Sequence, residues 1–373
     1  MSEPSTQDNY GLARVAPVQE IPAPVLPYQP RNPQTYRPKI ALVGCGGIAA
    51  QHLHAYKNAG FEVAALCSRD ASRARAYQQK YFPAAQVTVD FASLLCREEL
   101  EVFDLTAHPA ERAALIEAAL RAGKHVLSQK PFVLDLDVGA RLCELAEQCG
   151  VRLAVNQNGR WAPHFSYLKQ ALAAGLIGTL QSVNFSLHWD HQWISGTRFE
   201  EIEPLILYDF GIHWFDLAAS FFAGRAARSV FALQVKALEQ PACVPMLAHA
   251  LIEFEGGTAS LNFNANVTHG QEDRTVLAGT AGTLVSEGPS LSEQSVTLHT
   301  ATGRARPALT GTWFVEGFHG AMAELLCAVE EGRSPQNNAR ENLRSLALCF
   351  AAVASAQTGR PCQPGEVRSI RLR

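Results

Sequence analysis

KIALVGCGGIAAQHLHAY, residues 39–56, places an apolar run, a group of glycines and an amphipathic stretch one after another. The apolar run is typical of a buried strand and the amphipathic stretch of a helix. The glycines between them spell Gly-x-Gly-x-x-Ala, a turn that either cradles the phosphates of a nucleotide or only joins a strand to a helix. The motif alone is weak, so the rest of the chain has to decide between these two interpretations.

Each position of this turn has a physical reason in a nucleotide site. Gly44 would allow the tight turn, Gly46 would let the backbone approach a pyrophosphate, and Ala49 would let the helix pack closely on the strand. The helix that follows, predicted over 48–59, would point its amide groups and the positive end of its dipole at the phosphates. In a dinucleotide site, the binding residues of this turn are predicted to be Gly44, Gly46, Gly47 and Ile48.

Strand and helix patterns alternate from residue 39 to about residue 160. Alternation at this spacing predicts a parallel, doubly wound sheet, and hence a Rossmann dinucleotide-binding domain over residues 37–160. The predicted strands cover 40–43, 62–67, 101–107 and 151–157, and the predicted helices cover 48–59, 71–81, a segment ending at 122 and 135–149.

The pattern changes after residue 160, where alternating apolar and polar residues predict half-buried strands. We expect an α+β domain over residues 161–373 with a broad, mostly antiparallel open sheet, which binds substrate and mediates oligomerisation, and whose closing helix packs back near the first domain. Its predicted strands cover 179–189, 228–237, 247–255, 258–265, 273–278, 283–286 and 294–299, and its predicted helices cover 165–174, 209–223, 317–331 and 339–356.

Residues 1–36 are rich in proline and predict an extended arm. Two interpretations stay open for it: a disordered tail, or an arm that lies on its own subunit or on a neighbouring one.

Length and composition exclude several classes of protein. The 373 residues favour two domains, and a net charge of −3 gives no electrostatic footprint for nucleic acid or an anionic membrane. The longest apolar stretch, 346–356, is too short to span a bilayer, and no secretory signal is visible. Nine cysteines without a Cys-x-x-Cys pair favour reduced thiols over disulfides or a zinc site. We therefore predict a cytoplasmic protein without a bound metal.

The end of the second predicted strand addresses the choice of cofactor. An acid commonly stands there to bind the ribose hydroxyls, but this chain has Ser68 followed by Arg69. A small hydroxyl beside guanidinium groups, with Arg73 one helical turn further on, suits a 2′-phosphate, so NADP(H) is favoured and NAD(H) stays possible. The alternative is that Asp70 caps the next helix and Arg69 is a solvated charge.

At GKHVLSQKPF, residues 123–132, the chain resembles the glucose–fructose oxidoreductase / inositol dehydrogenase / MocA family of nicotinamide-dependent sugar and cyclitol oxidoreductases. In that family a Glu-Lys-Pro segment follows such a strand, and its lysine lies beside the nicotinamide and the substrate. Lys130 and Pro131 match this segment. The segment LYDFGIHWFD (207–216) matches the family's Asp-x-Gly-x-His-x-x-Asp pattern, and GTAGTL (279–284) and AAVASAQTGRP (351–361) match its late sheet and closing helix.

Two residues depart from the family pattern. Gln129 replaces the glutamate, and Arg112 stands where many members have a histidine. Losing the glutamate removes an anion that would help to keep Lys130 protonated. Our hypothesis is that Gln129 makes Lys130 easier to deprotonate or changes its hydrogen-bonded posture.

Asp209, His213 and Asp216 form a polar stripe on an apolar helical segment, at spacings of four and three residues. Such a stripe is costly to bury unless it is hydrogen-bonded or lines a wet pocket. Spacing alone also allows Asp209 to be a helix cap and His213 to be a core histidine bonded to Asp216.

With the resemblance added, we predict catalytic roles for three side chains. His213 would be the base for the hydroxyl proton of a secondary alcohol, since its proton affinity lies near neutrality. Lys130 would hydrogen-bond the same oxygen, and Asp209 would position the neighbouring hydroxyls. Asp216 is expected to orient or anchor.

Two further stretches are candidates for the pocket, NQNGRWAPHF (156–165) and LHWDHQW (187–193). Each of their residues has an equally good interpretation as part of a packed strand end. Metal binding by His188, Asp190 and His191 lacks a supporting spacing. The predicted substrate-binding residues are Lys130, Arg160, Trp161, Trp189, Asp209 and His213, and the further predicted cofactor-binding residues are Thr106, His108, Gln129, Lys130 and Asn158.

We therefore expect an NAD(P)-dependent dehydrogenase or reductase acting on a sugar, sugar acid or cyclitol. One alternative is a redox-neutral enzyme that eliminates, epimerises or cleaves through a transient keto-sugar. Another is a non-catalytic cofactor-binding sensor on the same scaffold. A broad antiparallel sheet offers a self-complementary face, so we expect a homodimer or homotetramer formed through it.

Overall fold

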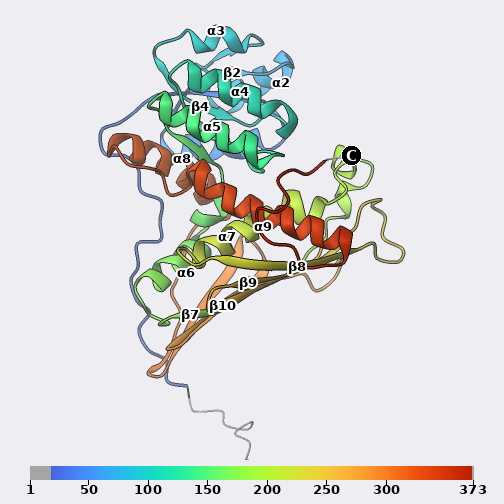
Figure 1. The fold of residues 1–373 in the computed structure, drawn as a ribbon. Helices are drawn as coiled ribbons and strands as arrows, with labels where there is room; N and C mark the ends of the chain where they lie inside the picture. The colour runs from blue at the N-terminus through green and yellow to red at the C-terminus, as the bar shows by residue number, and fades with distance from the viewer. Residues whose placement is uncertain (1–17, 372–373) are drawn as a thin grey trace, which may run out of the picture.

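A computed structural model describes residues 18–371 and contains two sheets, each with its own layer of helices (Figure 1). The first sheet is built from the first half of the chain and the second sheet from the second half. Both halves of the predicted fold class are confirmed.

The first sheet has six strands in the order β3-β2-β1-β4-β5-β6, and every pairing in it is parallel. The two short strands β3 and β6 form its edges. The strands are β1 (Lys39–Val43), β2 (Glu62–Cys67), β3 (Gln86–Thr88), β4 (Leu100–Leu105), β5 (His125–Ser128) and β6 (Leu153–Val155).

The helices between these strands follow the predicted alternation. The strand β3 and the helix α3 after it were not predicted, because three and five residues are too short to show a periodicity. The helices are α1 (Ala49–Ala59), α2 (Ala71–Tyr81), α3 (Phe91–Leu95), α4 (Pro109–Arg121) and α5 (Leu136–Gln148).

The second sheet has eight strands in the order β14-β13-β12-β11-β7-β10-β9-β8. Only the central pair β7 and β10 is parallel within it. The strands are β7 (Leu180–His188), β8 (Ala227–Val235), β9 (Leu247–Phe254), β10 (Gly257–Asn264), β11 (Glu272–Gly279), β12 (Gly282–Ser290), β13 (Glu293–Thr300) and β14 (Gly303–Ala305).

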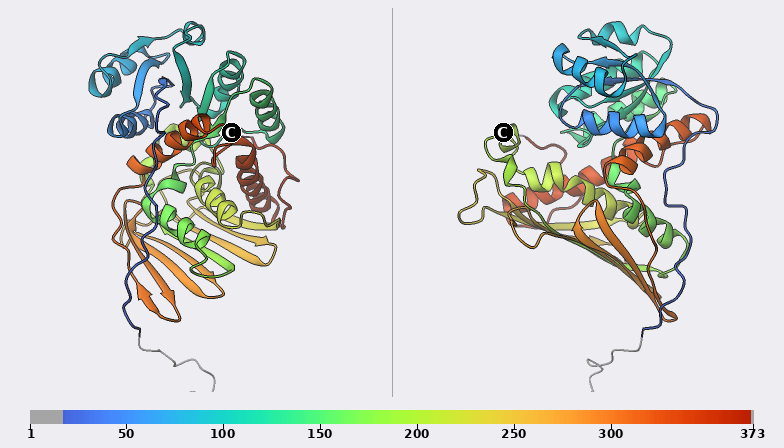
Figure 2. Two further views of the ribbon diagram at one scale, coloured as in Figure 1. Left: turned by 90° about the vertical axis from the view of Figure 1, so that its left-hand side faces the viewer. Right: turned by 180° about the vertical axis from the view of Figure 1, so that it is seen from behind.

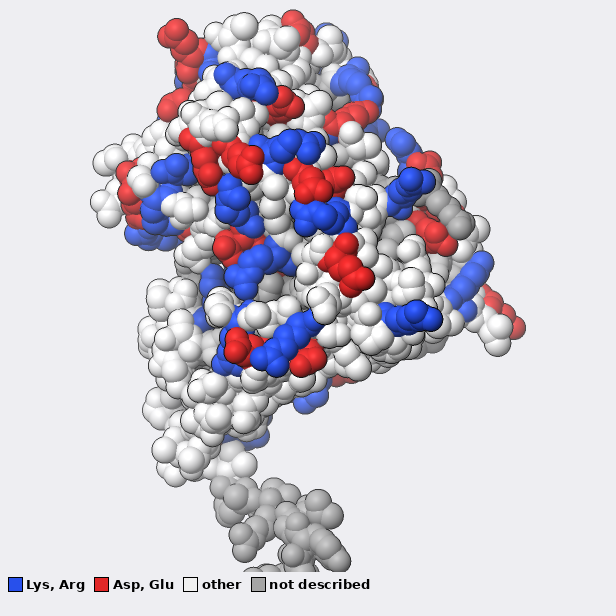
Figure 3. Space-filling view, viewed as in Figure 1, with Lys and Arg blue, Asp and Glu red and all other residues white. Residues whose placement is uncertain are grey.

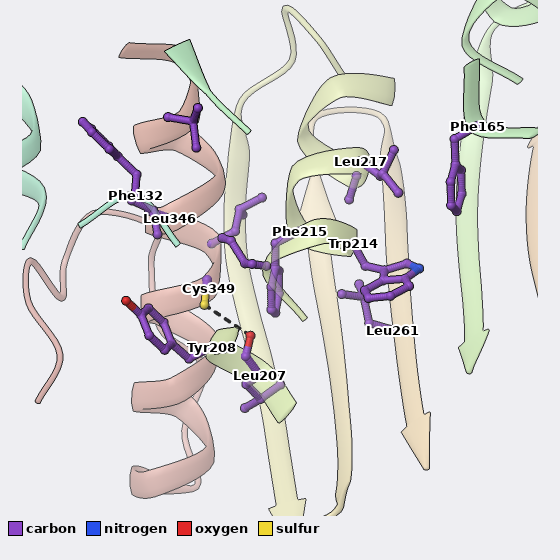
Figure 4. Packing of buried hydrophobic residues seen from close by; sticks show 14 of the residues in the cluster. Phe132, Phe165, Leu207, Tyr208, Trp214, Phe215, Leu217, Leu261, Leu346 and Cys349 are labelled. Atoms are coloured by element: carbon purple, nitrogen blue, oxygen red, sulfur yellow. Dashed lines mark hydrogen bonds between the residues drawn. The ribbon is translucent and has the colours of Figure 1, made fainter. Parts of the chain in front are cut away.

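Three helices cover one face of this sheet and leave the other face open (Figure 2). They are α6 (Pro163–Ala173), α7 (Ile212–Phe221) and α9 (Ala339–Thr358). Their core is aromatic: Phe215 of α7 lies on the side of α9, and Trp214 points toward Leu261 of β10 (Figure 4). Cys349 of α9 donates to the carbonyl of Leu207 at 3.3 Å.

The helix α8 (Val315–Glu330) belongs to the second half of the chain but completes the core of the first domain. Its Phe318, Met322 and Leu326 are buried with Ile40 and Leu53. The long helix α9 then runs between α5 and the strand β8, so the closing helices tie the two domains together (Figure 1).

The described part of the N-terminal arm lies along its own chain in an extended path past both domains (Figure 1). Ile21 donates to the carbonyl of Arg304 at 2.8 Å, next to the edge strand β14, and Ser166 donates to the carbonyl of Tyr28 at 2.6 Å. Further along, Thr35 and its neighbours donate to Glu330 and lower its pKa to about 2. Residues 18–36 thus lie along their own chain in this structure, while residues 1–17 lie outside the described part.

Acidic and basic side chains are interspersed over the face shown in Figure 3. Among the helices in residues 18–371, none is both long and apolar enough to cross a membrane.

Candidate active site

The glycine turn lies at the carboxyl end of β1, against the exit of β4. Gly44 has φ of +105°, and a Cβ added to it would lie 2.6 Å from the amide nitrogen of Ala107. Thr106 also holds the end of β4 against the turn, because its hydroxyl donates to the carbonyl oxygens of Val43, at 3.1 Å, and Gly44. Only glycine fits this close approach.

The turn suits an anionic ligand. A Cβ added to Gly46 or Gly47 would meet nothing within 4 Å, so the backbone there is open to close approach. No side chain caps the start of α1 at Ile48, and the first turn of α1 carries no acid. Its amide groups and dipole are therefore available to a pyrophosphate, which these residues fit.

The end of β2 is polar and exposed. Asp70 caps α2 by accepting from the amides of Ser72 and Arg73, as the alternative interpretation of this residue held. Ser68 accepts from the amide of Asp70 at 3.2 Å. Arg69 forms an ion pair with Glu111 at 2.8 Å, but its side chain is 84% exposed. Surface pairs of this kind are weak and do not prevent Arg69 from binding another anion.

His108, predicted to bind the cofactor, caps α4 instead of pointing to a partner elsewhere in residues 18–371. Its Nδ1 accepts from the amide of Ala110 at 3.4 Å, and the residue is exposed. It lies two residues beyond Thr106, at the same edge of the sheet as the glycine turn.

Lys130 joins the two domains. It follows β5, and its Nζ donates to the backbone carbonyl of Asp209 at 2.8 Å and lies 3.4 Å from the carboxylate Oδ2. Both side chains retain some exposure, 16% for Lys130 and 14% for Asp209. Two residues 79 positions apart in the chain thus meet at one partly accessible point.

Arg112 clamps the segment that carries Lys130. Its guanidinium is buried and donates to the carbonyls of Ala107, Gln129 and Pro131. Burial lowers the pKa of Arg112 to about 10, so the group stays charged at neutral pH. Arg112, which replaces a histidine of the family pattern, therefore binds backbone carbonyls on both sides of Lys130 in this chain.

Asp209 lies in a π-helical turn, Ile206–Phe210, that precedes α7. The amide of Gly211 donates to the carbonyl of Ile206 at 2.7 Å, and a Cβ on Gly211 would lie 2.7 Å from that same oxygen. The predicted continuous helix over 209–223 was therefore wrong at its start. The π turn inserts Asp209 between the two domains, and π turns are frequent at functional sites. The alternative that Asp209 caps the helix is also wrong, since α7 has no side-chain cap.

His213 sits one turn further on. Its Nδ1 is buried without a hydrogen-bond partner among the described residues, and its ring lies edge-on to Trp313 with centroids 5.3 Å apart. Burial and, second, the charge of Lys130 lower the pKa of His213 well below its ordinary value of 6.5. The imidazole is therefore neutral at neutral pH and can accept a proton.

Asp216 turns away from His213 and pairs with Arg160. The carboxylate accepts from Nε at 2.5 Å and from Nη2 at 2.7 Å, and it also accepts from Ser345 of α9 at 2.8 Å. The alternative of a core His213 bonded to Asp216 is therefore wrong, and the expected anchoring role of Asp216 agrees with these contacts. Arg160 donates its remaining Nη1 to the carbonyl of Gln336, so its contacts do not support the predicted binding of substrate.

Asn158 and Trp161 lie under α8 on a 3₁₀ turn, Asn158–Trp161. Two glycines of α8 leave room for them: a Cβ on Gly317 would lie 2.9 Å from the carbonyl of Asn158, and one on Gly320 would lie 2.2 Å from Trp161. Asn158 is buried, whereas Trp161 keeps partial exposure.

Trp189 is 8% exposed and stacks on His191 with centroids 5.0 Å apart. His191 in turn lies edge-on to Phe210, the neighbour of Asp209, at 4.8 Å. An aromatic wall therefore adjoins the turn that carries Asp209.

No three His, Cys, Asp or Glu side chains in residues 18–371 are grouped so that they could hold a metal ion.

One buried polar group was not predicted. His52 of α1 and Asp104 of β4 have no exposed surface, and they connect to Gln129. The only sign in the sequence was a histidine on the apolar side of the first helix and an aspartate inside an otherwise apolar strand.

Comparison with known proteins follows the same division into two parts. The sequence model described as "Oxidoreductase family, NAD-binding Rossmann fold" (GFO_IDH_MocA) matches residues 38–157. The one described as "GFO/IDH/MocA C-terminal domain" matches residues 165–285. Together they cover the first sheet, the strands β7 to β11 of the second sheet, and all three of Lys130, Asp209 and His213.

Relatives match along most of their length. A D-apiose dehydrogenase from Paraburkholderia graminis is 29% identical over 339 residues, covering 86% of this chain and 88% of that protein. An inositol 2-dehydrogenase from Rhizobium meliloti is 25% identical over 333 residues, covering 85% and 96%. An oxidoreductase from Agrobacterium radiobacter, solved in complex with NAD+, L-tartaric acid and magnesium, shares the fold with a TM-score of 0.79 at 23% identity, over 88% of this chain and 99% of that one.

Proposed function

Because this chain belongs to the Gfo/Idh/MocA family of NAD(P)-dependent oxidoreductases, we propose that it transfers a hydride between the nicotinamide and a secondary alcohol or ketone of a sugar, sugar acid or cyclitol. One observation carries the proposal: Lys130 of the nucleotide-binding half reaches Asp209 of the other half, with a neutral His213 beside them. An acid–base pair at a domain junction is what oxidation of a carbinol requires of the protein.

The three side chains take separate roles. His213 accepts the hydroxyl proton, because its lowered pKa keeps the ring unprotonated. The ammonium of Lys130 hydrogen-bonds the reacting oxygen and stabilises negative charge on it. Asp209 fixes the lysine and binds a neighbouring hydroxyl, which positions the substrate. When bound, the nicotinamide supplies the hydride acceptor or donor.

For the cofactor we propose NADP(H), held at the pyrophosphate by the glycine turn. The support is the polar end of β2, where Ser68 stands in place of an acid and the exposed side chains of Arg69 and Arg73 flank it. Guanidinium groups bind phosphate with two parallel hydrogen bonds. In this arrangement Arg69 exchanges Glu111 for the 2′-phosphate.

For the substrate we propose a polyhydroxylated ring. The named relatives act on D-apiose and on inositol, and the aromatic wall formed by Trp189, His191 and Phe210 adjoins Asp209. Aromatic faces beside hydrogen-bonding groups are suited to sugar rings. Trp161 and Asp209 are the further residues that we assign to this pocket.

We also propose that the open face of the second sheet binds a second copy of the chain. Phe231, Leu233 and Val235 alternate along β8 and are exposed, and Leu251 of β9 lies directly opposite Phe231. Contiguous exposed apolar side chains mark association sites.

All nine cysteines are free, which supports a reducing compartment such as the cytoplasm.

Titration of the purified protein with NADPH and NADH, followed by nicotinamide fluorescence, tests the cofactor. We expect tighter binding of NADPH, weakened in Arg69→Ala and retained in Arg75→Ala. Arg75 is an exposed arginine of α2, the helix that follows Arg69, and has no partner in the described residues. Equal loss in both variants would refute the phosphate grip.

A screen of D-apiose, inositol and related polyols with NADP⁺ tests the reaction. Stoichiometric growth of cofactor absorbance with product would support net hydride transfer, whereas product without absorbance change would indicate a redox-neutral reaction. Lys130→Ala must abolish either activity without abolishing cofactor binding. Full activity in that variant would refute the assignment of the site.

A further inference from the structure

The buried group of His52, Asp104 and Tyr56 connects to Lys130 through the side chain of Gln129. The ring Nδ1 of His52 lies 2.7 Å from Oδ2 of Asp104, and the hydroxyl of Tyr56 donates to the same oxygen at 2.7 Å. All three residues are fully buried. On the other side of the ring, Nε2 of His52 lies 2.9 Å from the side-chain nitrogen of Gln129.

The hydrogen bond between the backbone amide of Lys130 and the side chain of Gln129 determines which nitrogen of His52 carries the proton. The backbone amide of Lys130 can only donate, and it lies 2.6 Å from a side-chain oxygen of Gln129. The Gln129 nitrogen therefore faces His52, and since an amide nitrogen also only donates, Nε2 of His52 must be the acceptor. The ring proton then sits on Nδ1 and is donated to Asp104. The amide of Asn156 lies 3.3 Å from the same Nε2, as a second donor would.

From this geometry we propose that His52 is a positioning residue that holds Lys130 through Gln129, and that it does so as the neutral Nδ1–H tautomer. The proposal rests on the proposed function of Lys130. Gln129 accepts from the amide of Lys130, while Arg112 donates to the carbonyls of Gln129 and Pro131. The backbone on both sides of Lys130 is thereby fixed, and its ammonium is aimed at Asp209.

Gln129 and His52 are complementary as hydrogen-bond donor and acceptor. A carboxylate at position 129 could still accept from the amide of Lys130 but could not donate to Nε2 of His52. The ring would then have to carry a second proton to make the same contact, between the new carboxylate and Asp104. The groups that contact the ring are Asp104, Tyr56, Gln129, Asn156 and the aromatic ring of Phe318. Arg112 is a nearby cation, since it donates to the carbonyl of Gln129 and interacts with the charge of Asp104, but no basic side chain in residues 18–371 contacts the ring itself.

The tautomer is tested directly by ¹⁵N spectroscopy of histidine-labelled protein, with the His52 signals identified by their loss in His52→Gln. We expect the His52 ring of the parent protein to carry its single proton on Nδ1, and the ring in Gln129→Glu to carry a proton on both nitrogens. A ring protonated on Nε2 in the parent protein, or an unchanged ring in Gln129→Glu, would overturn the proposal. This measurement does not depend on activity.

The positioning role is tested by kinetics. We expect His52→Leu to lower kcat at least about tenfold with cofactor affinity within about threefold, because small misplacements of a catalytic group cost up to about a hundredfold. His52→Gln, which restores an acceptor toward Gln129, should recover most of kcat. His54→Leu is the matched control, since His54 lies on the exposed side of the same helix.

The outcomes separate the two proposals. Parallel loss of kcat and cofactor affinity in both His52 variants, without rescue by glutamine, would reduce His52 to a structural residue and overturn the positioning role. A Lys130→Ala variant with unchanged kcat would instead refute the proposed function of Lys130, even with the tautomer of His52 as stated.

Discussion

Replacement of Asp216 by asparagine removes a buried charge while keeping the shape of the side chain. Asp216 is 1% exposed and its partner Arg160 is 8% exposed. Burial acts to lower the pKa of Arg160, but Asp216 outweighs it and the net pKa is raised, so the guanidinium is charged at every working pH. In Asp216→Asn this buried cation loses the carboxylate that it contacts and keeps only the weaker influence of Glu341 and Glu324.

The magnitude follows from the environment of the pair. Breaking one partner of a buried pair costs about 3–5 kcal/mol of unfolding free energy. The new amide oxygen can still accept one hydrogen bond, from Arg160 or from Ser345, so we expect the lower end, about 3 kcal/mol. A loss of this size is a large fraction of the stability of an ordinary domain, about 5–15 kcal/mol.

Urea unfolding followed by tryptophan fluorescence reports on this site, because Trp161 adjoins Arg160 in sequence and Trp214 lies on the same helix as Asp216. Glu147→Gln is the matched control: it also removes a carboxylate that accepts two arginine hydrogen bonds, but its pair with Arg340 is exposed. We expect it to cost at most about 1 kcal/mol.

A double variant, Arg160→Met with Asp216→Leu, isolates the charge. Because both charges are removed together, it should be more stable than either single variant. If Asp216→Asn unfolds at the same urea concentration as Glu147→Gln, the reasoning from the buried ion pair is refuted.

Three other tests address the glycine turn, a buried acid and the proposed base. Gly44→Ala should weaken NADPH binding by more than about tenfold in the fluorescence titration, because its Cβ would lie 2.6 Å from the Ala107 amide nitrogen at φ of +105°. Asp273→Asn should gain stability over the parent protein as pH rises from about 5 to about 8, measured by urea midpoints. Burial raises the pKa of Asp273 to about 8, so the folded state keeps a proton that the unfolded chain releases near pH 4, and the fold weakens over that interval. The acidic limb of the kcat profile should lie below pH 6.5, because burial and Lys130 lower the pKa of His213 and a base acts only when unprotonated.

Each of these tests has a control or a contrary result. Gly60→Ala also places a side chain at positive φ, but in open space and at the far end of α1, so it should leave NADPH affinity unchanged. Glu253→Gln, on the exposed side of β9, should not alter the pH dependence of stability. An acidic limb at or above pH 6.5 would contradict the role given to His213.

The helices and strands were predictable because each depends on the periodicity of residues that are close together in the chain. The strand–helix alternation of the first domain, and strands such as 247–255 against the observed Leu247–Phe254, follow from side-chain periodicity alone. The prediction was wrong where a local pattern was broken by backbone geometry. The apolar run over 209–223 reads as one helix, yet Gly211 permits a π turn ahead of Ile212.

The candidate site was predictable in its residue types and less so in its partners. Lys130, Asp209 and His213 stood out as polar residues in apolar surroundings and in the motifs of a known family. Arg160 was equally polar and equally well placed after a strand, but its charge is used by Asp216. Which of two similar side chains meets a ligand and which meets another side chain depends on where distant segments lie.

The two kinds of sheet, the glycine turn and the family could be inferred from the amino-acid sequence, because each depends on residues that are neighbours in the chain. Three features emerge from the folded chain alone: α8 completes the first domain, Lys130 reaches Asp209, and His52 contacts Gln129. Those contacts join residues 77 or more positions apart. Their hydrogen bonds depend on distances and directions within a packed core, which no local periodicity records.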